Sequence, residues 1–344
     1  MIFEPRYTIS NRLLSNITRI HTLASQLNSR PFPHVVLFEF ERTARAVSAH
    51  ASTSIEGNPL PLTEVKRLLK QHPSYIRDSE QEVLNYNAAL EMLDAYLKKD
   101  GGVLTLELIL RIQEQVVDKL LPASQSGHLR EEPVVVNDPR TGQVVYLPPD
   151  TRDVSVFLKE LLAYIDQHQG EVDPLILAGV FHKQFVLIHP FIDGNGRTTR
   201  LSTKILLASM GLNTFNLFSF ENYYNQNVTK YFQTVGEFGD YYDKAENTDF
   251  TAWLEYFTEG IIDELLRVEK LLPQAMTPET ALQLHHQIIL DIIREKGFIT
   301  DSDYAKKTER ARATRALDFQ KLVDLGIIER RGEKRGSYYV FADA

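Results

Sequence analysis

The amino-acid sequence predicts an all-α protein with one short β-hairpin and a small winged helix-turn-helix domain in its C-terminal part. Three observations lead to this fold class. Apolar residues recur at helical spacing along most of the chain, which indicates amphipathic helices. Strand-forming residues are concentrated in two stretches, near 134–147 and 327–341. The length of 344 residues is enough for two or three domains with a sizeable core.

The N-terminal helical region, residues 1–110, contains helices with recognisable start and stop signals. Ser10 is the expected N-cap of the first helix. A second helix, about 36–56, should end before Gly57, because glycine favours the position that follows a helix. Three more helices are expected at about 64–71, 79–98 and 106–120, with Thr63 and Thr105 as N-caps of the first and the last of them.

The core, residues 111–272, begins with a hairpin. Two short β-prone runs lie on either side of a turn sequence at 137–142, and together they indicate a hairpin within about 127–149. A short exposed strand edge can pair with an extended peptide, and the alternative is a purely structural hairpin. Further helices are then expected at about 152–167, 174–188, 201–210 and 250–272.

Composition and charge exclude several function classes. The chain has no cysteine, so it has no disulfide, thiol nucleophile or cysteine-based zinc site, and it suits a reducing cytoplasm. A formal net charge of −8 argues against a protein that coats nucleic acid nonspecifically or binds an anionic membrane. The first residues lack a signal pattern, and no run approaches the ~20 apolar residues of a membrane span. We therefore expect a cytoplasmic protein that does not enter a membrane.

The segment from His189 to Arg200 concentrates the possible chemistry of the chain. Its sequence is His-Pro-Phe-Ile-Asp-Gly-Asn-Gly-Arg-Thr-Thr-Arg, a glycine-rich loop that leads into a helix near Asn195. Backbone N–H groups of residues 194–196, with the free N–H groups of the new helix, can hold an anion. Arg197 lies three residues before Arg200, so both planar forks can reach phosphate oxygens from one helix face.

Two further side chains of this segment indicate a reaction. Asp193 offers a hard oxygen ligand for Mg²⁺ beside the anion site, while phosphates supply other ligands. His189, with an unperturbed pKa of about 6.5, can take a proton from a hydroxyl near neutral pH. The combination predicts transfer of a phosphorus-centred group from a nucleotide–Mg²⁺ complex to a hydroxyl. Taken singly, the loop, the histidine and the arginines are each more often structural, and neither a P-loop nor a Rossmann glycine pattern is present.

Glu56 is the second informative position. It stands at the C-terminal end of the helix predicted at about 36–56, where a carboxylate is unfavourably placed against the helix dipole. We therefore expect a compensating partner, and an arginine is the natural candidate. Ser52 lies one turn earlier, on the same face of the helix. The alternative is an exposed glutamate that happens to precede a glycine.

Residues 189–200 resemble the complete signature of the Fic domain family, His-x-Phe-x-Asp/Glu-Gly-Asn-Gly-Arg-x-x-Arg. The resemblance implies an all-α Fic fold and a protein adenylyltransferase. Such an enzyme would move AMP from ATP to a Ser, Thr or Tyr hydroxyl of a target protein and release pyrophosphate. It implies that His189 is the general base and that Asp193 binds Mg²⁺. By the same resemblance, the phosphates of ATP are held by Gly194, Asn195, Gly196 and Arg197, and the γ-phosphate by Arg200.

Residues 52–57 are similar to the inhibitory motif Ser/Thr-x-x-x-Glu-Gly/Asn, which lies N-terminal to many Fic cores. In that class the glutamate pairs with the last arginine of the signature. The resemblance therefore implies that Glu56, with Ser52 on the same helix, inhibits the enzyme by holding Arg200. It also implies that Asn227 and Tyr231 contact adenine, although Val228 stands where an arginine is often found.

The resemblance implies a role for the hairpin and leaves several activities open. The hairpin at 127–149, called the flap below, would align the target segment against His189. Some family members transfer phosphate or phosphocholine, and some remove AMP with the inhibitory glutamate orienting a water molecule. The intact Gly-Asn-Gly-Arg at 194–197 favours AMP transfer over phosphate transfer, while an enzyme that removes AMP, or both adds and removes it, stays an alternative. The family also favours a homodimer.

Residues 279–344 resemble a winged helix-turn-helix. Helices are expected at about 281–296, 301–307 and 310–325, followed by strands at 327–330 and 338–341. Five cations crowd the third helix, as a face that contacts DNA phosphates would require; they are Lys306, Lys307, Arg310, Arg312 and Arg315. Nearby acidic residues lower the expected affinity; they are Glu309, Asp318 and Asp324. The alternatives are a DNA-binding regulator with a nucleotide-sensing Fic core, and a module that binds protein or dimerises.

Overall fold

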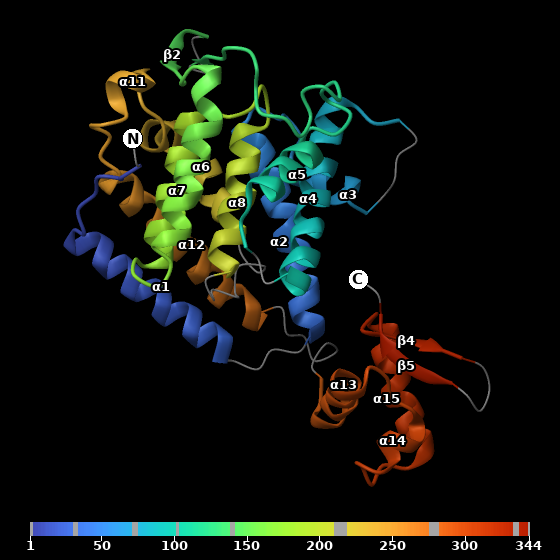
Figure 1. Ribbon diagram of the computed structural model, residues 1–344. Helices are drawn as coiled ribbons and strands as arrows, with labels where there is room; N and C mark the ends of the chain where they lie inside the picture. The colour runs from blue at the N-terminus through green and yellow to red at the C-terminus, as the bar shows by residue number, and fades with distance from the viewer. Residues whose placement is uncertain are drawn as a thin grey trace. The chain divides into compact units, whose positions relative to one another are not determined.

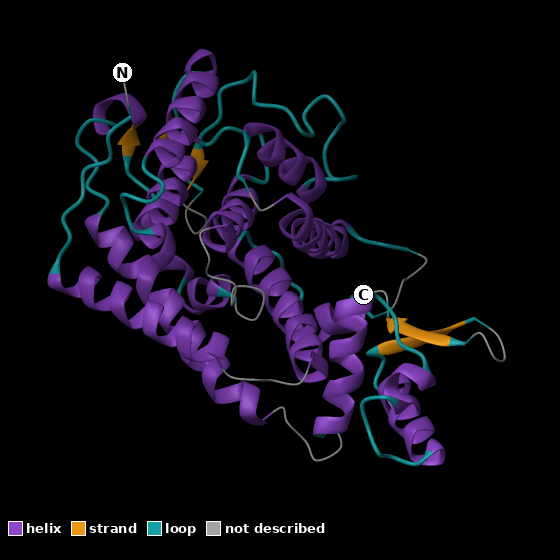
Figure 2. Cartoon of the chain, turned by 60° about the horizontal axis from the view of Figure 1, so that its bottom comes forward, coloured by secondary structure: helices purple, strands orange, loops and turns teal. Residues whose placement is uncertain are grey.

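The computed structural model describes residues 3–29, 34–70, 75–100, 103–137, 142–209, 219–274, 282–332 and 337–342. Within these ranges the protein is mostly helical, as predicted, with two small sheets (Figures 1 and 2). The chain separates into two compact units. The first comprises residues 1–29 and 43–268, and the second comprises residues 30–42 and 269–344.

The N-terminal helices are α1 (Asn11–Ser29), α2 (His34–Ile55), α3 (Leu62–Leu68), α4 (Asp78–Asp100) and α5 (Leu106–Val116). Two of the expected N-caps are present: Ser10 Oγ accepts from the Leu13 N–H at 3.1 Å, and Thr105 accepts from the Leu108 N–H at 3.1 Å. The expected cap at Thr63 is wrong. Helix α3 begins earlier because Pro61, already in an extended conformation, takes the N-cap position, and its carbonyl accepts the first helical bonds. Residue 71, the expected end of this helix, lies outside the described residues.

Two adjacent helices form the centre of the first unit, α7 (Pro174–Ile188) and α8 (Asn195–Ser209) (Figure 1). Helix α6 (Thr151–Gln167) packs against α7, and α4 and α5 pack against α8. Nearly every side chain of α7 is buried, as expected for a helix that is apolar all round. The site residues at the end of α7 are therefore attached to a buried central helix.

Helix α12 (Thr251–Gln274) makes an especially close approach to α7. The indole N–H of Trp253 donates to the carbonyl of Gly179 at 2.8 Å. A Cβ at Gly179 would lie 2.5 Å from Leu254 Cδ2, so this contact requires glycine. This close contact holds α12 against α7.

The flap is a hairpin, as predicted, but its strands are short. Strand β1 (Val136–Asn137) pairs antiparallel with β2 (Val144–Leu147), and the turn at 138–141 lies outside the described residues. A third strand, β3 (Gly239–Asp240), pairs parallel with β2 and was not predicted. Two residues cannot show an alternating pattern, so the sequence gives no sign of this strand.

The remaining helices of the first unit are α9 (Phe220–Gln226), α10 (Val228–Val235) and α11 (Tyr241–Lys244). Helices α9 and α10 meet at Asn227, whose side chain accepts from the Lys230 N–H and starts α10. Among the residues that the structure describes, no helix is both long enough and apolar enough to cross a membrane.

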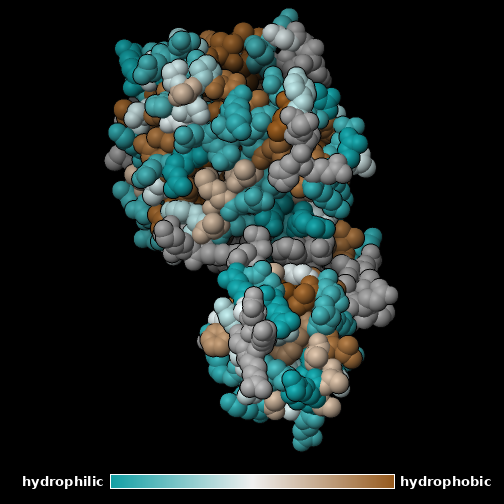
Figure 3. Space-filling view, turned by 90° about the vertical axis from the view of Figure 1, so that its right-hand side faces the viewer, coloured by the Kyte–Doolittle hydropathy of each residue, from teal (hydrophilic) through white to brown (hydrophobic). Residues whose placement is uncertain are grey.

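The second unit contains α13 (Leu284–Lys296), α14 (Asp301–Ala305), α15 (Arg312–Asp324), β4 (Ile328–Arg331) and β5 (Tyr338–Phe341). The two strands form an antiparallel ribbon with Ile328 opposite Phe341. A separate apolar core includes Ile289, Tyr304, Phe319 and Leu322. Three helices followed by a ribbon is the order of elements that the sequence predicts. On the face shown in Figure 3, hydrophilic side chains cover much of each unit, with hydrophobic side chains scattered among them.

Candidate active site

A cavity of about 480 Å³ opens where α7 ends and α8 begins. Its other walls come from the end of α2, the flap, α10 and residues 235–238. Six of the predicted site residues line it: Glu56, His189, Asn195, Gly196, Arg200 and Tyr231. The structure thus brings the N-terminal Glu56 and the signature residues to one place.

His189 is held with one ring nitrogen committed and the other available. It follows α7 in a left-handed backbone conformation, with φ 48° and ψ 61°. Its Nδ1 lies 3.2 Å from the carbonyl oxygen of Val186. A carbonyl can only accept, so Nδ1 carries the proton and Nε2 keeps a free lone pair. Burial lowers the pKa of His189 below its ordinary value, which keeps the imidazole neutral and able to accept a proton at neutral pH.

The loop between the two helices is closed by its own side chains. Asn195 Oδ1 accepts from the Phe191 N–H at 2.9 Å, and Asn195 Nδ2 donates to the Phe191 carbonyl at 2.8 Å. Gly194 has φ 81°, which favours glycine, and a Cβ there would lie 3.0 Å from Val117 Cγ1. The Asn195 amide is thus engaged inside the loop, which leaves its backbone N–H as the group best placed to serve an anion.

Arg200 is fully buried and bound to the end of α2. Its Nη2 donates to Glu56 Oε1 at 2.7 Å and to the Ser52 carbonyl at 2.9 Å, and its Nε donates to Ser52 Oγ at 2.8 Å. Burial lowers the pKa of Arg200, but the Glu56 carboxylate together with Tyr231 and Tyr86 outweighs it, and the net pKa is above the ordinary value. The expected compensating arginine for Glu56 is therefore present, and it is the one that the resemblance indicated.

The Glu56 carboxylate lies against the N-terminal end of α8. A Cβ placed on Gly196 would collide with Glu56 Oε1 and would lie 3.0 Å from Arg200 Nη1. The glycine thus leaves room for a negatively charged group beside the first turn of α8, where free N–H groups and the helix dipole favour an anion. In this structure the protein's own carboxylate takes that position.

A buried polar network fixes α2 against the core independently of Glu56. Lys204 Nζ on α8 donates to Ser48 Oγ on α2 at 2.9 Å and pairs with Glu221 at 3.2 Å. The Tyr86 hydroxyl on α4 donates to the same Glu221 carboxylate at 2.7 Å. Glu221 is fully buried, and Ser48 is 1% exposed. No signal in the sequence singles out this network, because each member is a common polar residue within a helix.

Asp193 and Arg197 lie outside the lining of the cavity. Arg197 Nη2 donates to Asp193 Oδ2 at 3.0 Å, and Arg197 Nη1 lies 3.4 Å from Glu82 Oε1. Arg197 is 2% exposed, yet its Nε and Nη1 have no hydrogen-bond partner within the described part of the chain. The Asp193 side chain is 51% exposed. A half-exposed carboxylate next to unsatisfied guanidinium nitrogens fits Mg²⁺ at Asp193 together with phosphate oxygens that Arg197 could bind.

The two residues expected at adenine differ in their surroundings. Tyr231 is buried, its ring stacks on Tyr224 at 4.8 Å, and its hydroxyl lies 3.5 Å from Arg200 Nη1. Asn227 is exposed, caps α10 and does not line the cavity. A contact of either residue with adenine stays a prediction.

The sequence reasoning did not identify Arg130 and Tyr146 as site residues. Arg130 Nε donates to the His189 carbonyl at 2.8 Å, and Arg130 N donates to the Pro190 carbonyl at 2.9 Å. The Tyr146 hydroxyl donates to the Leu187 carbonyl at 3.1 Å. Because the acceptors are backbone carbonyls distant in sequence, no pairing of residue types could have indicated these contacts.

The cations of the second unit are partly neutralised within it. Arg310 Nε donates to Asp318 at 2.8 Å, and Arg315 Nε donates to Asp301 at 2.8 Å. Lys306, Lys307 and Arg312 are exposed. The face expected to contact DNA thus has two of its five cations paired with carboxylates, which weakens the charge argument for DNA.

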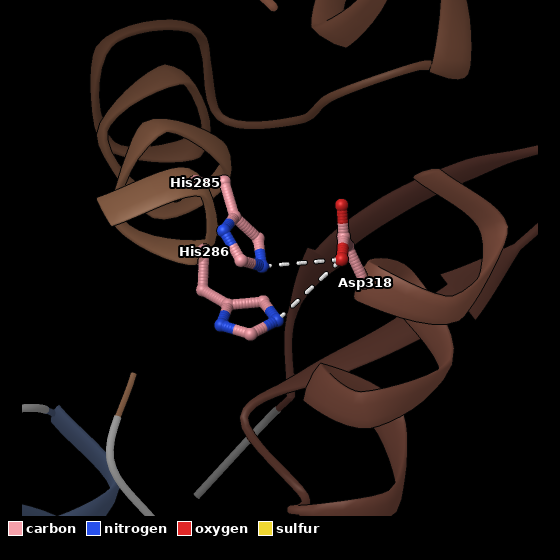
Figure 4. A group of neighbouring side chains, drawn as sticks. All are labelled: His285, His286 and Asp318. Atoms are coloured by element: carbon pink, nitrogen blue, oxygen red, sulfur yellow. Dashed lines mark ion pairs between the residues drawn. The ribbon is translucent and has the colours of Figure 1, made fainter. Parts of the chain in front are cut away.

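His285, His286 and Asp318 lie close together in the same unit (Figure 4). The backbone N–H of Gln283 donates to His286 Nδ1 at 3.2 Å. Nδ1 is therefore unprotonated, so the neutral ring carries its proton on Nε2, the atom that faces Asp318 at 3.8 Å. Burial lowers the pKa of His286 to about 4, which favours this neutral form. A ring with that tautomer offers no lone pair to a metal ion at this place, so we interpret the cluster as structural.

The fold and the site together define a helical domain in which a loop between two buried helices carries a histidine beside the N-terminal end of the second helix. Residues 103–207 match the model of the Fic/DOC family, which confirms the predicted resemblance over this part of the chain.

Two named relatives show how far the similarity extends. The chain is 28% identical over 197 residues to "Protein adenylyltransferase Fic" of Aedes aegypti, covering 56% of this chain and 38% of that protein. It is 29% identical over 175 residues to the protein of the same name from Culex quinquefasciatus, covering 50% of this chain and 33% of that protein. The chain thus spans little more than a third of the length of these curated relatives.

Solved structures extend the similarity of fold beyond the signature. A Fic family protein from Desulfovibrio desulfuricans G20 aligns with a TM-score of 0.65 and 20% identity, covering 98% of both chains. A Fic domain-containing signaling protein from Bacteroides thetaiotaomicron VPI-5482 aligns with a TM-score of 0.58 and 21% identity, covering 76% of this chain and 97% of that one. At these identities the likeness concerns the fold alone.

Proposed function

We propose that the protein is an adenylyltransferase that moves AMP from ATP to a Ser, Thr or Tyr hydroxyl of a target protein and releases pyrophosphate. The observation that carries the proposal is the shared cavity. The free Nε2 of His189 and the anion-accepting end of α8, with Gly196 and Arg200, line the same 480 Å³ space. The two relatives above bear the name of such an enzyme, which supports this choice of reaction.

The proposed chemistry assigns one task to each group. His189 Nε2 takes the proton of the target hydroxyl as the hydroxyl oxygen attacks the α-phosphorus. The bond from the α-phosphorus to the bridging oxygen of the β-phosphate breaks, and pyrophosphate leaves. Backbone N–H groups at the start of α8 and the guanidinium groups of Arg197 and Arg200 hold the β- and γ-phosphates. Mg²⁺ held by Asp193 and phosphate oxygens would neutralise charge that develops on the leaving group.

The proposal includes autoinhibition and leaves room for hydrolytic removal of AMP. The bond of Arg200 Nη2 to Glu56 supports autoinhibition, because a guanidinium that is paired with a carboxylate is less available to a γ-phosphate. Removal of AMP by a water molecule that Glu56 orients would use the same cavity, since the Glu56 carboxylate lines it. The same cavity can thus serve transfer of AMP, removal of AMP, or both.

Labelled ATP tests the reaction class. The Glu56→Gly variant is incubated with Mg²⁺, a cell extract and ATP labelled at either the α- or the γ-phosphate. We expect protein-bound label from α-labelled ATP, none from γ-labelled ATP, and loss of the α-label when a chelator removes Mg²⁺. Protein-bound label from the γ-position would instead identify phosphate transfer and contradict the proposal.

The pH dependence of the rate should follow His189. Burial places the pKa of His189 below about 6.5, the value of an unperturbed imidazole. The active form is neutral, so the rate should be nearly constant above that pH and should fall only as the pH drops through the lowered pKa. The rate of AMP incorporation measured between pH 5 and pH 8 checks this, and an acid limb centred above pH 7 would contradict it.

A further inference from the structure

The flap supplies hydrogen bonds to three carbonyl groups at and just after the end of α7. A helix leaves its last carbonyl groups without partners inside the helix, and each must find a donor elsewhere. Within α7 the Leu187 carbonyl accepts from the Tyr146 hydroxyl at 3.1 Å. Just beyond the helix, the His189 carbonyl accepts from Arg130 Nε at 2.8 Å, and the Pro190 carbonyl accepts from Arg130 N at 2.9 Å. All of these donors belong to the flap, residues 127–149.

Arg130 also joins the two ends of the flap. Its Nη2 donates to the Pro149 carbonyl at 2.5 Å, and its Nη1 lies 3.4 Å from the Glu132 carbonyl. The residue is 4% exposed. A buried guanidinium whose three nitrogens each donate to a carbonyl oxygen is held in one orientation, because turning it would leave a buried charge with fewer partners.

The backbone of His189 needs such support. Its left-handed conformation, with φ 48°, is unfavourable for a residue that has a Cβ, and it persists only where neighbours determine it. This conformation turns the chain at the end of α7 and sets the direction of the imidazole. Besides the bonds of His189 to Phe185 and Val186, the flap contacts that hold it are those of Arg130 at the His189 carbonyl and at the next one, together with the Tyr146 bond two residues earlier.

We propose that Arg130 and Tyr146 are positioning residues for His189: by capping α7 from the flap, they hold its Nε2 toward the reacting hydroxyl. The proposal rests on the proposed transfer of AMP. It gives the flap a second role besides alignment of a target, because the element that would receive the target also carries the hydrogen bonds that fix the base. Neither residue would touch the reacting atoms through these contacts.

The charge of Arg130 provides a measurable consequence. The charged groups that affect His189 are Glu56 at the end of α2, Asp193 in the signature loop and Arg130 in the flap. Burial lowers the pKa of His189, the Val186 carbonyl and the two carboxylates raise it, and Arg130 lowers it. Loss of the positive charge at position 130 should therefore raise the pKa of His189, whereas a lysine there should largely preserve it.

The test compares four variants in the Glu56→Gly background. Arg130→Gln removes the charge and the cap, Arg130→Lys keeps the charge, and Tyr146→Phe removes a single hydroxyl. Arg152→Gln is the matched control, since this arginine follows the flap but its side chain is 80% exposed. For each variant we would measure the initial rate of α-label incorporation, the dissociation constant for ATP by calorimetry, and the pKa of His189 by NMR, with His189→Ala assigning the signal.

We expect a selective loss of rate. Displacement of the base by about 1 Å can lower a rate roughly 100-fold, so Arg130→Gln should approach that loss. Removal of the single neutral hydrogen bond in Tyr146→Phe should lower the rate roughly fivefold. Arg130→Lys should recover part of the rate and retain the parent pKa. Affinity for ATP should change less than about twofold throughout, because the triphosphate site at α8 is untouched.

The outcomes separate this proposal from the proposed function. If Arg130→Gln retains the parent rate and the parent pKa of His189, the positioning role is overturned. It is equally overturned if Arg130→Gln weakens ATP binding as much as it slows transfer, since that pattern indicates general damage to the site. If the Glu56→Gly parent transfers no AMP, the proposed function fails, and the pKa comparison between Arg130→Gln and Arg130→Lys still decides the role of Arg130.

Discussion

Replacing His189 with alanine should lower the rate of AMP transfer by roughly 10²–10⁴-fold, the usual contribution of a general base. The reason is the state of the imidazole. Its Nδ1 proton is committed to the Val186 carbonyl at 3.2 Å, so Nε2 can only accept, and burial keeps the ring neutral. Alanine removes this acceptor, and within the described residues that line the cavity no other histidine replaces it.

The measurement uses α-labelled ATP in the Glu56→Gly background, where inhibition is relieved. His21→Ala is the matched control, because His21 makes only a partly exposed pair with Asp173. We expect the control to retain the parent rate. Calorimetry should show that His189→Ala still binds ATP, since the N–H groups of α8 and Arg200 are intact. Persistent labelling by His189→Ala would remove the assignment of the base.

The parts of the site that could be predicted from the sequence are those that depend on neighbouring residues. The loop and the start of α8 at Asn195 follow from two glycines and an asparagine within three residues. The partner for Glu56 follows from local electrostatics, because a carboxylate at a helix C-terminus requires compensation, although the sequence alone could not select Arg200 without the family resemblance. Both inferences depend only on residues that lie close together in the sequence.

The parts that could not be predicted depend on how distant segments meet. Arg130 and Tyr146 bind backbone carbonyls, which every residue has, so their partners leave no trace in the sequence. The direction of Arg197, toward Asp193 and Glu82 and away from the cavity lining, is decided by packing against α4. Asn227 did carry a local signal, since asparagine is a preferred N-cap, but its position within an aromatic and amide-rich run concealed the break between α9 and α10.

Replacing Glu56 with glycine should raise the rate of AMP transfer by roughly 10- to 100-fold. The bond from Arg200 Nη2 to Glu56 Oε1 is 2.7 Å long, and a charge-assisted hydrogen bond contributes about 1.5–3 kcal/mol, or about one to two factors of ten. The variant frees Nη2 for a γ-phosphate and removes a carboxylate that would repel it. Arg200 should stay in place, because Ser52 still accepts from its Nε at 2.8 Å and from its Nη2 at 2.9 Å.

The size of the increase depends on α2 remaining docked. Ser48 and Ser52 are buried, and Lys204 binds Ser48 at 2.9 Å. Loss of the Glu56 carboxylate at the end of α2 should therefore not release the helix. Glu56→Gln should give a smaller increase, since it removes the charge but keeps an acceptor, and Glu246→Gly, at an exposed turn residue, should give none. An unchanged rate in Glu56→Gly would contradict inhibition by this residue. A decreased rate would mean that Glu56 takes part in the reaction. The site permits such a role for Glu56 in hydrolytic removal of AMP, but not in transfer of AMP, where His189 is the base.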